Sequence, residues 1–308
     1  MKSGVRLSID CGAGLTLKNP VLTASGTFGY GIEFEPYLEL SALGGYVTKG
    51  ISPRSRGGNA PARIVETPSG MLNAIGLQNV GVDRFIEEKL PQMRGRDTAI
   101  VVNVFGTSIE DYIFVTERLE RAEGIAALEL NLSCPNVHEG GLEIGRSAQA
   151  IEQFTRAVRE RTAKPLWVKL TPNVSDIAEM GRAAVAGGAD ALSLVNTYVG
   201  MVIDIERRTP VLSHKTGGLS GPAIRPLAIA AVYQVAKALP GVPLCGIGGI
   251  VSARDVVEYL MAGASCVQIG TANFNDPSVA TRVVSDLHQW CVSHDVSDVK
   301  QLIRAAHE

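Results

Sequence analysis

The chain lacks the sequence features of a secreted or membrane-spanning protein. No run approaches the ~20 consecutive apolar residues that cross a bilayer, and the opening "MKSGVRLSIDCGAG" has no long apolar core of a signal peptide. Its five cysteines are scattered without a CxxC pair, in a chain of 308 residues that is too large to need disulfide staples. We therefore expect a cytoplasmic protein with reduced thiols and no bound metal.

An excess of charge of one sign is also missing. The 29 Lys and Arg residues against 31 Asp and Glu residues give a net charge of -2, so no overall basic field points to nucleic acid or to an anionic membrane. Hydrophobic residues make up 45% and charged residues 19%, with no low-complexity block, as in ordinary soluble globular proteins. A small, locally recognised ligand fits this composition best.

Short apolar runs alternate with longer segments of helical periodicity from about residue 20 onward. The eight runs are "VLTAS", "GYVTKG", "IVVNVFG", "ALELNLS", "LWVKLTP", "ALSLVN", "PLCGIGG" and "CVQIGT", and the helical segments include 147–161, 175–186, 224–239, 253–261 and 279–292. Repeated strand-then-helix units predict parallel strands. Eight of them, without a GxGxxG fingerprint after the first strand, favour an α/β fold of the (β/α)8 TIM barrel type over an open sheet. We predict one barrel domain over residues 1–308.

Two further features are expected around this barrel. "VRLSID" and "LTLKNP" flank "CGAG", which predicts an N-terminal β-hairpin that plugs the bottom of the barrel. The connections 51–98 and 198–222 are much longer than ordinary βα loops, and long insertions on a barrel usually build its site.

Polar residues follow the predicted strands, at the end where barrel enzymes place their active site. Taken singly, each is more often a solvated loop residue or a helix cap. As a set they predict a binding mouth, because every strand end carries a small, hydroxyl or amide residue or a lysine. The set is Ser25, Thr48, Lys49, Asn103, Asn131, Lys169, Thr171, Asn196, Thr197, Gly248, Gly249, Gly270 and Thr271.

The glycines after the last two strands indicate a phosphate. Barrels often bind phosphate in these loops, and glycine lets backbone N–H groups approach it closely. Three glycine-containing segments favour a phosphate site over ordinary tight turns. They are Gly248 with Gly249, Gly270, and the glycine-rich loop "TGGLSGPA" around Gly221. Lys169 would then face the ring of a flavin, whose reduced form is stabilised by a nearby cation. Pyridoxal phosphate also has a phosphate and needs a lysine, so both cofactors remain open at this point.

Cys134 differs from the other cysteines. Cys245 and Cys266 fall inside strand patterns, and together with Cys11 and Cys291 they are interpreted as buried structural thiols. Cys134 lies past a strand end in a polar loop, which makes it a candidate base or nucleophile.

Motifs along nearly the whole chain resemble, in order, those of the dihydroorotate dehydrogenase family: "YVTKGIS", "MLNAIGLQNVG", "NLSCPNVHEGG", "VKLTPNV", "GGLSGPAI", "GIGGI" and "IGTANF". The cysteine in "SCPN" is similar to the soluble class 1 enzymes, whereas the membrane-associated class has serine there and an additional N-terminal helical segment. The continuation "NVHEGG" is more similar to the NAD-linked subclass, called 1B, than to the fumarate-using one.

The resemblance implies an FMN enzyme that oxidises (S)-dihydroorotate to orotate in de novo pyrimidine (UMP) biosynthesis. Cys134 would remove the proton from C5 while hydride passes from C6 to FMN. The substrate positions would be Lys49, Asn73, Ala74, Ile75, Gly76, Leu77, Asn131, Asn196 and Thr197. The flavin positions would be Ser25, Lys49, Gly50, Asn103, Asn131, Lys169, Val195, Gly221, Gly248, Gly249, Gly270 and Thr271.

The NAD-linked subclass also implies a partner subunit that carries FAD and a 2Fe-2S cluster, in a heterotetramer built on a homodimer of this chain. This chain has neither a Rossmann unit nor cysteines at cluster spacing, so electrons would leave through another protein. Three alternatives are a fumarate-using class 1 enzyme, a flavin barrel similar to dihydropyrimidine dehydrogenase, and a non-catalytic barrel that binds a phosphorylated ligand. A substrate of the uracil type has no carboxylate to pair with Lys49.

Overall fold

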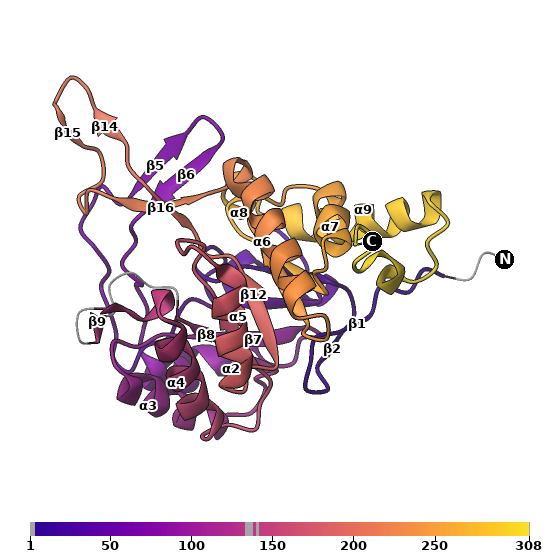
Figure 1. Ribbon diagram of the computed structural model, residues 1–308, viewed down its shortest axis with the longest axis horizontal. Coiled ribbons are helices and arrows are strands. Elements are labelled where there is room, and N and C mark those ends of the chain that lie inside the picture. Colours follow the sequence, from indigo (N-terminus) through magenta and orange to yellow (C-terminus); the bar gives the residue numbers. More distant parts are fainter. Residues whose placement is uncertain (1–3, 133–137, 140–141, 308) are drawn as a thin grey trace.

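A computed structural model describes residues 4–132, 138–139 and 142–307. Its centre is a closed barrel of parallel strands, which confirms the predicted (β/α)8 fold (Figure 1). In chain order these strands are β3 (Val21–Thr23), β4 (Gly45–Val47), β7 (Ala99–Val104), β8 (Ala127–Asn131), β11 (Leu166–Lys169), β12 (Ala191–Leu194), β17 (Leu244–Ile247) and β18 (Cys266–Ile269). All eight lie within or against the runs of the sequence pattern, and β18 closes the barrel by pairing with β3.

Helices cover the outside of the barrel. The longer ones are α3 (Ile109–Glu120), α4 (Ala148–Arg159), α5 (Ile177–Ala186), α6 (Arg225–Ala238), α7 (Ala253–Met261) and α9 (Val279–Ser293). Shorter turns are α1 (Val82–Arg84), a π-helix (Phe85–Lys89), α2 (Leu90–Met93), α8 (Ala272–Asn275) and 3-10 turns at Ile32–Phe34, Leu40–Ala42, Ile144–Arg146, Pro222–Ile224 and Val299–Leu302. Side-chain caps start several of these helices, since Ser108, Ser147, Asp176 and Ser252 each accept from backbone N–H groups of the first turn.

The predicted N-terminal hairpin is present and closes the bottom of the barrel. Strand β1 (Ile9–Asp10) pairs antiparallel with β2 (Thr16–Leu17). Its buried side chains Ile9, Cys11 and Leu17 pack with inward-facing residues of the barrel strands, among them Trp167 and Cys245. This end of the interior is therefore apolar and filled, which leaves the opposite end for a ligand.

The two long insertions meet in one small sheet beside the mouth of the barrel. The first contributes β5 (Ile64–Thr67) and β6 (Gly70–Asn73), and the second contributes β13 (Tyr198–Gly200) and β16 (Gly217–Ser220), in the order β13-β16-β6-β5. A further hairpin, β14 (Ile203–Asp204) with β15 (Thr209–Pro210), protrudes from the body (Figure 1). The chain also forms β9 (His138–Glu139) and β10 (Leu142–Glu143), which pair with each other. The insertions were predicted as site-building segments, but their pairing into one sheet was not.

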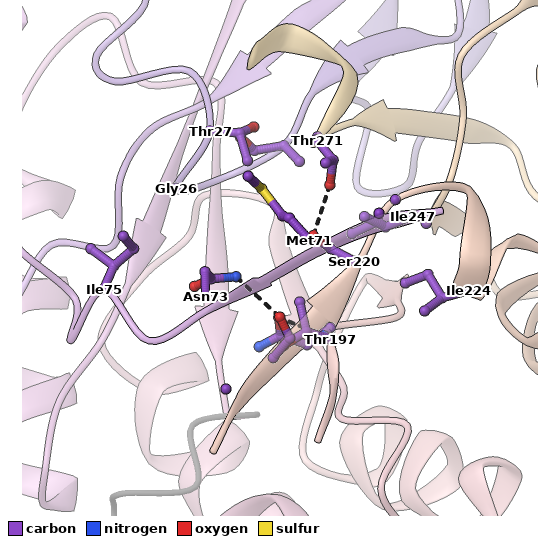
Figure 2. A pocket seen from close by; sticks show the side chains of 18 of the residues that line it. Gly26, Thr27, Met71, Asn73, Ile75, Thr197, Ser220, Ile224, Ile247 and Thr271 are labelled. Carbon is purple, nitrogen blue, oxygen red and sulfur yellow. Dashed lines mark hydrogen bonds between the residues drawn. The ribbon is translucent and has the colours of Figure 1, made fainter. Parts of the chain in front are cut away.

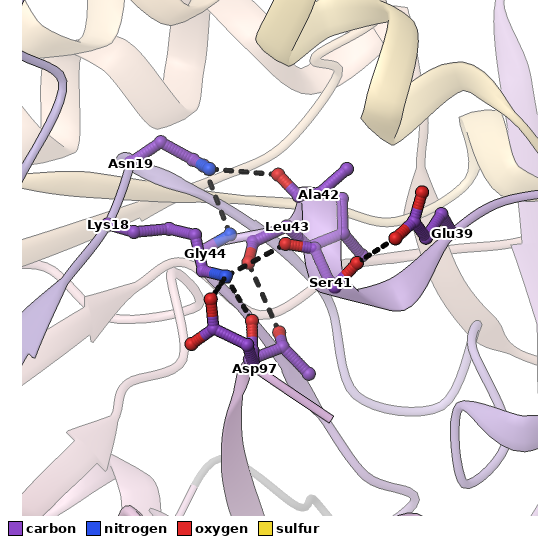
Figure 3. A network of polar contacts seen from close by, with 9 residues as sticks. Lys18, Asn19, Glu39, Ser41, Ala42, Leu43, Gly44 and Asp97 are labelled. Carbon is purple, nitrogen blue, oxygen red and sulfur yellow. Dashed lines mark hydrogen bonds and ion pairs between the residues drawn. The ribbon is translucent and has the colours of Figure 1, made fainter. Parts of the chain in front are cut away.

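A polar network ties together the segments that enter β3, β4 and β7 (Figure 3). Lys18 forms an ion pair with Asp97 and donates to the carbonyl oxygen of Ser41 at 2.8 Å. Asn19 donates to the carbonyl of Ala42 at 2.9 Å and accepts from the backbone N–H of Gly44 at 3.1 Å. These contacts lie at the amino ends of the strands, where barrels carry stability rather than chemistry.

Candidate functional site

A cavity of about 1160 Å³ opens at the carboxyl ends of the barrel strands and continues under the sheet of the two insertions. Figure 2 shows Met71 and Asn73 of β6, Ser220 of β16, and Thr271 after β18 gathered around it. Apart from Cys134, every residue predicted for substrate or flavin lines this one cavity. Cys134 lies outside the described residues. The structure therefore brings together positions that are spread from Ser25 to Thr271 in the sequence.

Lys169 stands at the end of β11 and is only 5% exposed. It lies directly across from Asn131, the last residue of β8, in the parallel register. Its ammonium nitrogen donates to Ser25 Oγ at 3.3 Å, from the loop after β3. A buried ammonium with a neutral hydroxyl contact retains donors and charge for an anionic ligand group.

Lys49, in the loop after β4, is half-buried and lines the same cavity. Burial lowers the pKa of its ammonium group, and the nearby Arg63 guanidinium lowers that pKa further, while Glu33 acts in the opposite direction. The two cations favour an anion between or beside them, such as a carboxylate. The sequence-based prediction did not include Arg63, because one arginine within a long insertion carries no local signal of where it points.

The predicted substrate segment begins in β6 and turns after it. The amide of Asn73 donates to the carbonyl oxygen of Gly218 in β16 at 3.4 Å (Figure 2). Asn59 holds the next residue by donating to the carbonyl of Ala74 at 2.9 Å. Gly76 and Leu77 then adopt positive φ angles of 78° and 56°, and the left-handed conformation costs energy for leucine. The turn is therefore held by the insertion sheet rather than by local preference.

Amide and hydroxyl groups line the side of the cavity below this turn. Asn196 and Thr197 follow β12, and Asn173 joins their loop to the one after β11. Asn173 donates to the carbonyl of Thr197 and to Thr171 Oγ1, both at 3.0 Å, and accepts from the backbone N–H of Val199. Asn173 was missed from the sequence, although it lies in the motif "LTPNV". Two of its partners, Thr197 and Val199, are distant in the chain and come next to it only in the fold.

The glycine segments divide into two kinds. The segment "TGGLSGPA", predicted as a glycine-rich loop, is in part the strand β16, which corrects that prediction. A Cβ at Gly217 would lie 2.6 Å from Leu212, and one at Gly218 would lie 2.0 Å from Thr197 Oγ1, so these glycines serve close strand packing. At Gly270, by contrast, the nearest protein atom to a Cβ would lie 3.5 Å away. Packing within the protein therefore does not require glycine at position 270. The close approach of a ligand to the backbone would require it.

Gly221, Gly248 and Gly249 adopt positive φ angles of 93°, 135° and 69° and line the same end of the cavity. Beside them, Thr271 donates to Ser220 Oγ at 2.8 Å (Figure 2). Positive φ angles at successive glycines turn backbone N–H groups in ways that other residues rarely allow. A Cβ at Gly221, Gly248 or Gly249 would also lie 2.8, 2.9 or 2.7 Å from protein atoms, so close packing requires glycine there too. The phosphate at this end stays a prediction.

The four described cysteines are buried, as expected for structural thiols. Burial raises the pKa of the Cys245 and Cys291 thiols, which disfavours the reactive thiolate. Within the described residues, no group of three or more His, Cys, Asp or Glu side chains is arranged to hold a metal ion. No helix in the described ranges has both the length and the apolar character needed to cross a membrane.

The sequence matches the profile of the family described as dihydroorotate dehydrogenase over residues 8–290. Three curated relatives are each named dihydroorotate dehydrogenase B (NAD(+)), catalytic subunit. That of Citrifermentans bemidjiense is 52% identical over 95% of this chain and 96% of its own length. Those of Geotalea daltonii and Geobacter sulfurreducens are 53% and 51% identical, each over 97% of both chains.

Proposed function

Because the chain belongs to the dihydroorotate dehydrogenase family, we propose that it is the catalytic subunit of an NAD-linked dihydroorotate dehydrogenase, which oxidises (S)-dihydroorotate to orotate for pyrimidine synthesis. The observation that carries the proposal is the single cavity at the carboxyl ends of the strands. It combines a glycine-lined end, a buried lysine and a second lysine beside an arginine. The glycine-lined end suits a phosphate, the buried lysine suits an electron-accepting ring, and the lysine beside the arginine suits a carboxylate.

The cofactor that fits is one FMN per chain. FMN supplies a ring that accepts the hydride of the substrate. The glycine-lined end, with Gly221, Gly248, Gly249, Gly270 and Thr271, would hold its phosphate. Ser25, Gly50, Asn103, Asn131, Lys169 and Val195 would hold the ring. Asn103 offers a direct test of fit, because its buried Oδ1 accepts no hydrogen bond from the described part of the chain and needs a donor.

The substrate would lie against the insertion sheet. Lys49 would bind the carboxylate, and the turn from Asn73 to Leu77 would cover the substrate. The amides of Asn131 and Asn196, with Thr197, suit the N–H and C=O groups of the pyrimidine ring. Cys134 would take the C5 proton, so that proton and hydride leave from opposite ends of one C–C bond. Lys49 with Arg63 favours a carboxylate over the uracil-type substrates of the dihydropyrimidine dehydrogenase alternative.

The name "catalytic subunit" given to the relatives implies a second subunit for those proteins. We extend this to the present chain: a partner with FAD and a 2Fe-2S cluster would carry electrons to NAD in a heterotetramer built on a homodimer of this chain. The NAD(+) in the relatives' names favours this acceptor over fumarate. Cytoplasmic location follows from the proposal and remains a prediction.

Anaerobic mixing tests the function. We expect purified protein to be yellow and to be bleached by dihydroorotate but not by dihydrouracil. The reduced protein alone should transfer electrons to NAD slowly, and addition of the partner subunit should accelerate this transfer. Colourless protein that FMN does not reconstitute would favour the non-catalytic binding barrel, and rapid NAD reduction by the chain alone would contradict the partner.

Replacing Lys169 with methionine should weaken FMN binding and lower the flavin midpoint potential. The reduced ring carries more negative charge than the oxidised ring, so loss of the buried cation destabilises the reduced form more. If the variant loses ten times more affinity for reduced FMN than for oxidised FMN, the midpoint potential falls by about 30 mV for a two-electron couple. The measurements are a fluorescence titration of the apoprotein with FMN and a redox titration. Lys164→Met, near the opposite end of the same barrel strand, should change neither value, and an unchanged potential in Lys169→Met would contradict the assignment.

A further inference from the structure

A buried carboxylate lies one layer below the cavity, and none of the roles above uses it. Glu129 of β8 is fully buried and does not line the cavity. Its Oε1 accepts from the amide nitrogen of Asn103 at 2.8 Å, and its Oε2 accepts from Ser193 Oγ and from the amide nitrogen of Gln268, both at 2.7 Å. A buried carboxyl group is costly unless its oxygens are hydrogen-bonded, and three donors surround this one. The cost calls for a role beyond filling the barrel.

The carboxylate determines how the Asn103 amide is oriented. Both oxygens of Glu129 accept hydrogen bonds, so Asn103 turns its NH2 and not its oxygen toward Glu129. Asn103 and Glu129 are direct neighbours in the register of β7 and β8. The backbone N–H of Asn103 is held as well, since it donates to Thr48 Oγ1 at 3.3 Å. The amide therefore has one favoured orientation.

This orientation turns the Asn103 oxygen away from Glu129. Oδ1 is buried and accepts no hydrogen bond from the described residues. It lies beside Gly50, where a Cβ would come within 2.9 Å of it, and both residues line the cavity. The oxygen of Gln268 also accepts no hydrogen bond from the described chain, but Gln268 does not line the cavity. Of these two residues, Asn103 is the one that belongs to the cavity lining.

We propose that Glu129 is a positioning residue of the flavin site: it orients the Asn103 amide so that an acceptor, rather than a donor, faces the bound ring. This inference rests on the proposed function. The group that the Asn103 oxygen would select is an N–H of the flavin ring. The carbonyl oxygens and unprotonated nitrogens of an isoalloxazine are acceptors and would be repelled by the same oxygen. A rotated Asn103 would reverse this preference.

An exchange of the two side-chain groups tests the proposal. Asn103→Asp places an oxygen against Glu129 Oε1 and should weaken FMN binding about tenfold or more, because two acceptors face each other. In the double variant Asn103→Asp with Glu129→Gln, the new amide donates to the carboxylate introduced at position 103, and its oxygen still accepts from Ser193 and Gln268. FMN affinity should then return to within about threefold of the original. Apoprotein titration and the visible flavin spectrum measure both variants.

Two further variants separate positioning from general stability and from the proposed function. Ser193→Ala removes a different donor to Glu129, so it should lower the melting temperature but leave FMN affinity within about threefold. Asn103→Ala should weaken FMN binding about tenfold even if Asn103→Asp does not fold. The positioning role would be overturned if the double variant did not regain FMN affinity, or if Ser193→Ala lost as much FMN affinity as Asn103→Asp. The proposed function is tested separately, because bleaching of the unmodified protein by dihydroorotate does not depend on either result. Unchanged FMN affinity in Asn103→Ala would also overturn it.

Discussion

Cys134→Ser should bind FMN normally but be reduced by dihydroorotate about 10²–10⁴ times more slowly near neutral pH, the range that a positioned general base contributes. A free thiol has a pKa of about 8.5 and provides some thiolate at neutral pH, whereas a serine hydroxyl ionises far less readily. The C5 proton would then lose its acceptor. Because the thiol itself must ionise, the unmodified protein should be reduced faster as the pH rises through the pKa of Cys134.

Anaerobic stopped-flow absorbance measures this rate in a single turnover. Dithionite should reduce the flavin of Cys134→Ser as fast as that of the unmodified protein, which shows that the cofactor is intact. Cys291→Ala, which removes a buried thiol in α9 outside the cavity, serves as the matched control and should keep its rate. A wild-type-like rate in Cys134→Ser would refute the assignment of this residue as the base.

Lys49→Met should raise the KM for dihydroorotate about 10- to 100-fold, the range for loss of a hydrogen bond between charged groups. The pH dependence has a definite sign. Burial and the nearby Arg63 guanidinium hold the pKa of Lys49 below its ordinary value of 10.5. The ammonium is charged below that lowered pKa and neutral above it, so KM should be low at neutral pH and rise toward alkaline pH. This alkaline rise should be absent in Lys49→Met.

Steady-state kinetics over a pH series, with FMN content verified for each sample, measures the effect. Lys237→Met on the exposed surface of α6 is the control and should retain both the KM and its pH profile. The Lys49 variant should also discriminate less between dihydroorotate and dihydrouracil, since only the former has a carboxylate. An unchanged KM would remove Lys49 from the substrate site and would weaken the case against the dihydropyrimidine dehydrogenase alternative.

Local pattern was sufficient for the barrel and for most of its mouth. The strand "LWVKLTP" predicts a buried strand that ends in a lysine, and Lys169 is the last residue of β11. Predicted helices such as 253–261 coincide with observed ones, because apolar periodicity and the Ser252 cap are both local. Since parallel strands of a closed barrel end on one face, residues at their ends were expected to meet there. All of them line the cavity except Thr48, which is buried and accepts from the backbone N–H of Asn103 instead.

Contacts between distant segments could not be predicted in this way. The sheet that covers the cavity pairs β6 with β16, which lie far apart in the chain, so no local period encodes their register. The glycines of "TGGLSGPA" have the composition of a loop, but their packing against Leu212 and Thr197 makes them a strand. Arg63 and Asn173 belong to the cavity only because these segments fold over it.

By itself, the sequence determined the barrel, the polar mouth, the glycine-rich end and the family, because all of these depend on residue type, spacing and order along the chain. Only the tertiary structure decided that Glu129 is enclosed by donors from three other strands, and that Arg63 lowers the pKa of Lys49. The physical reason is that hydrogen bonding, burial and charge interactions depend on distance in space. Residues remote in sequence become neighbours only when the barrel closes.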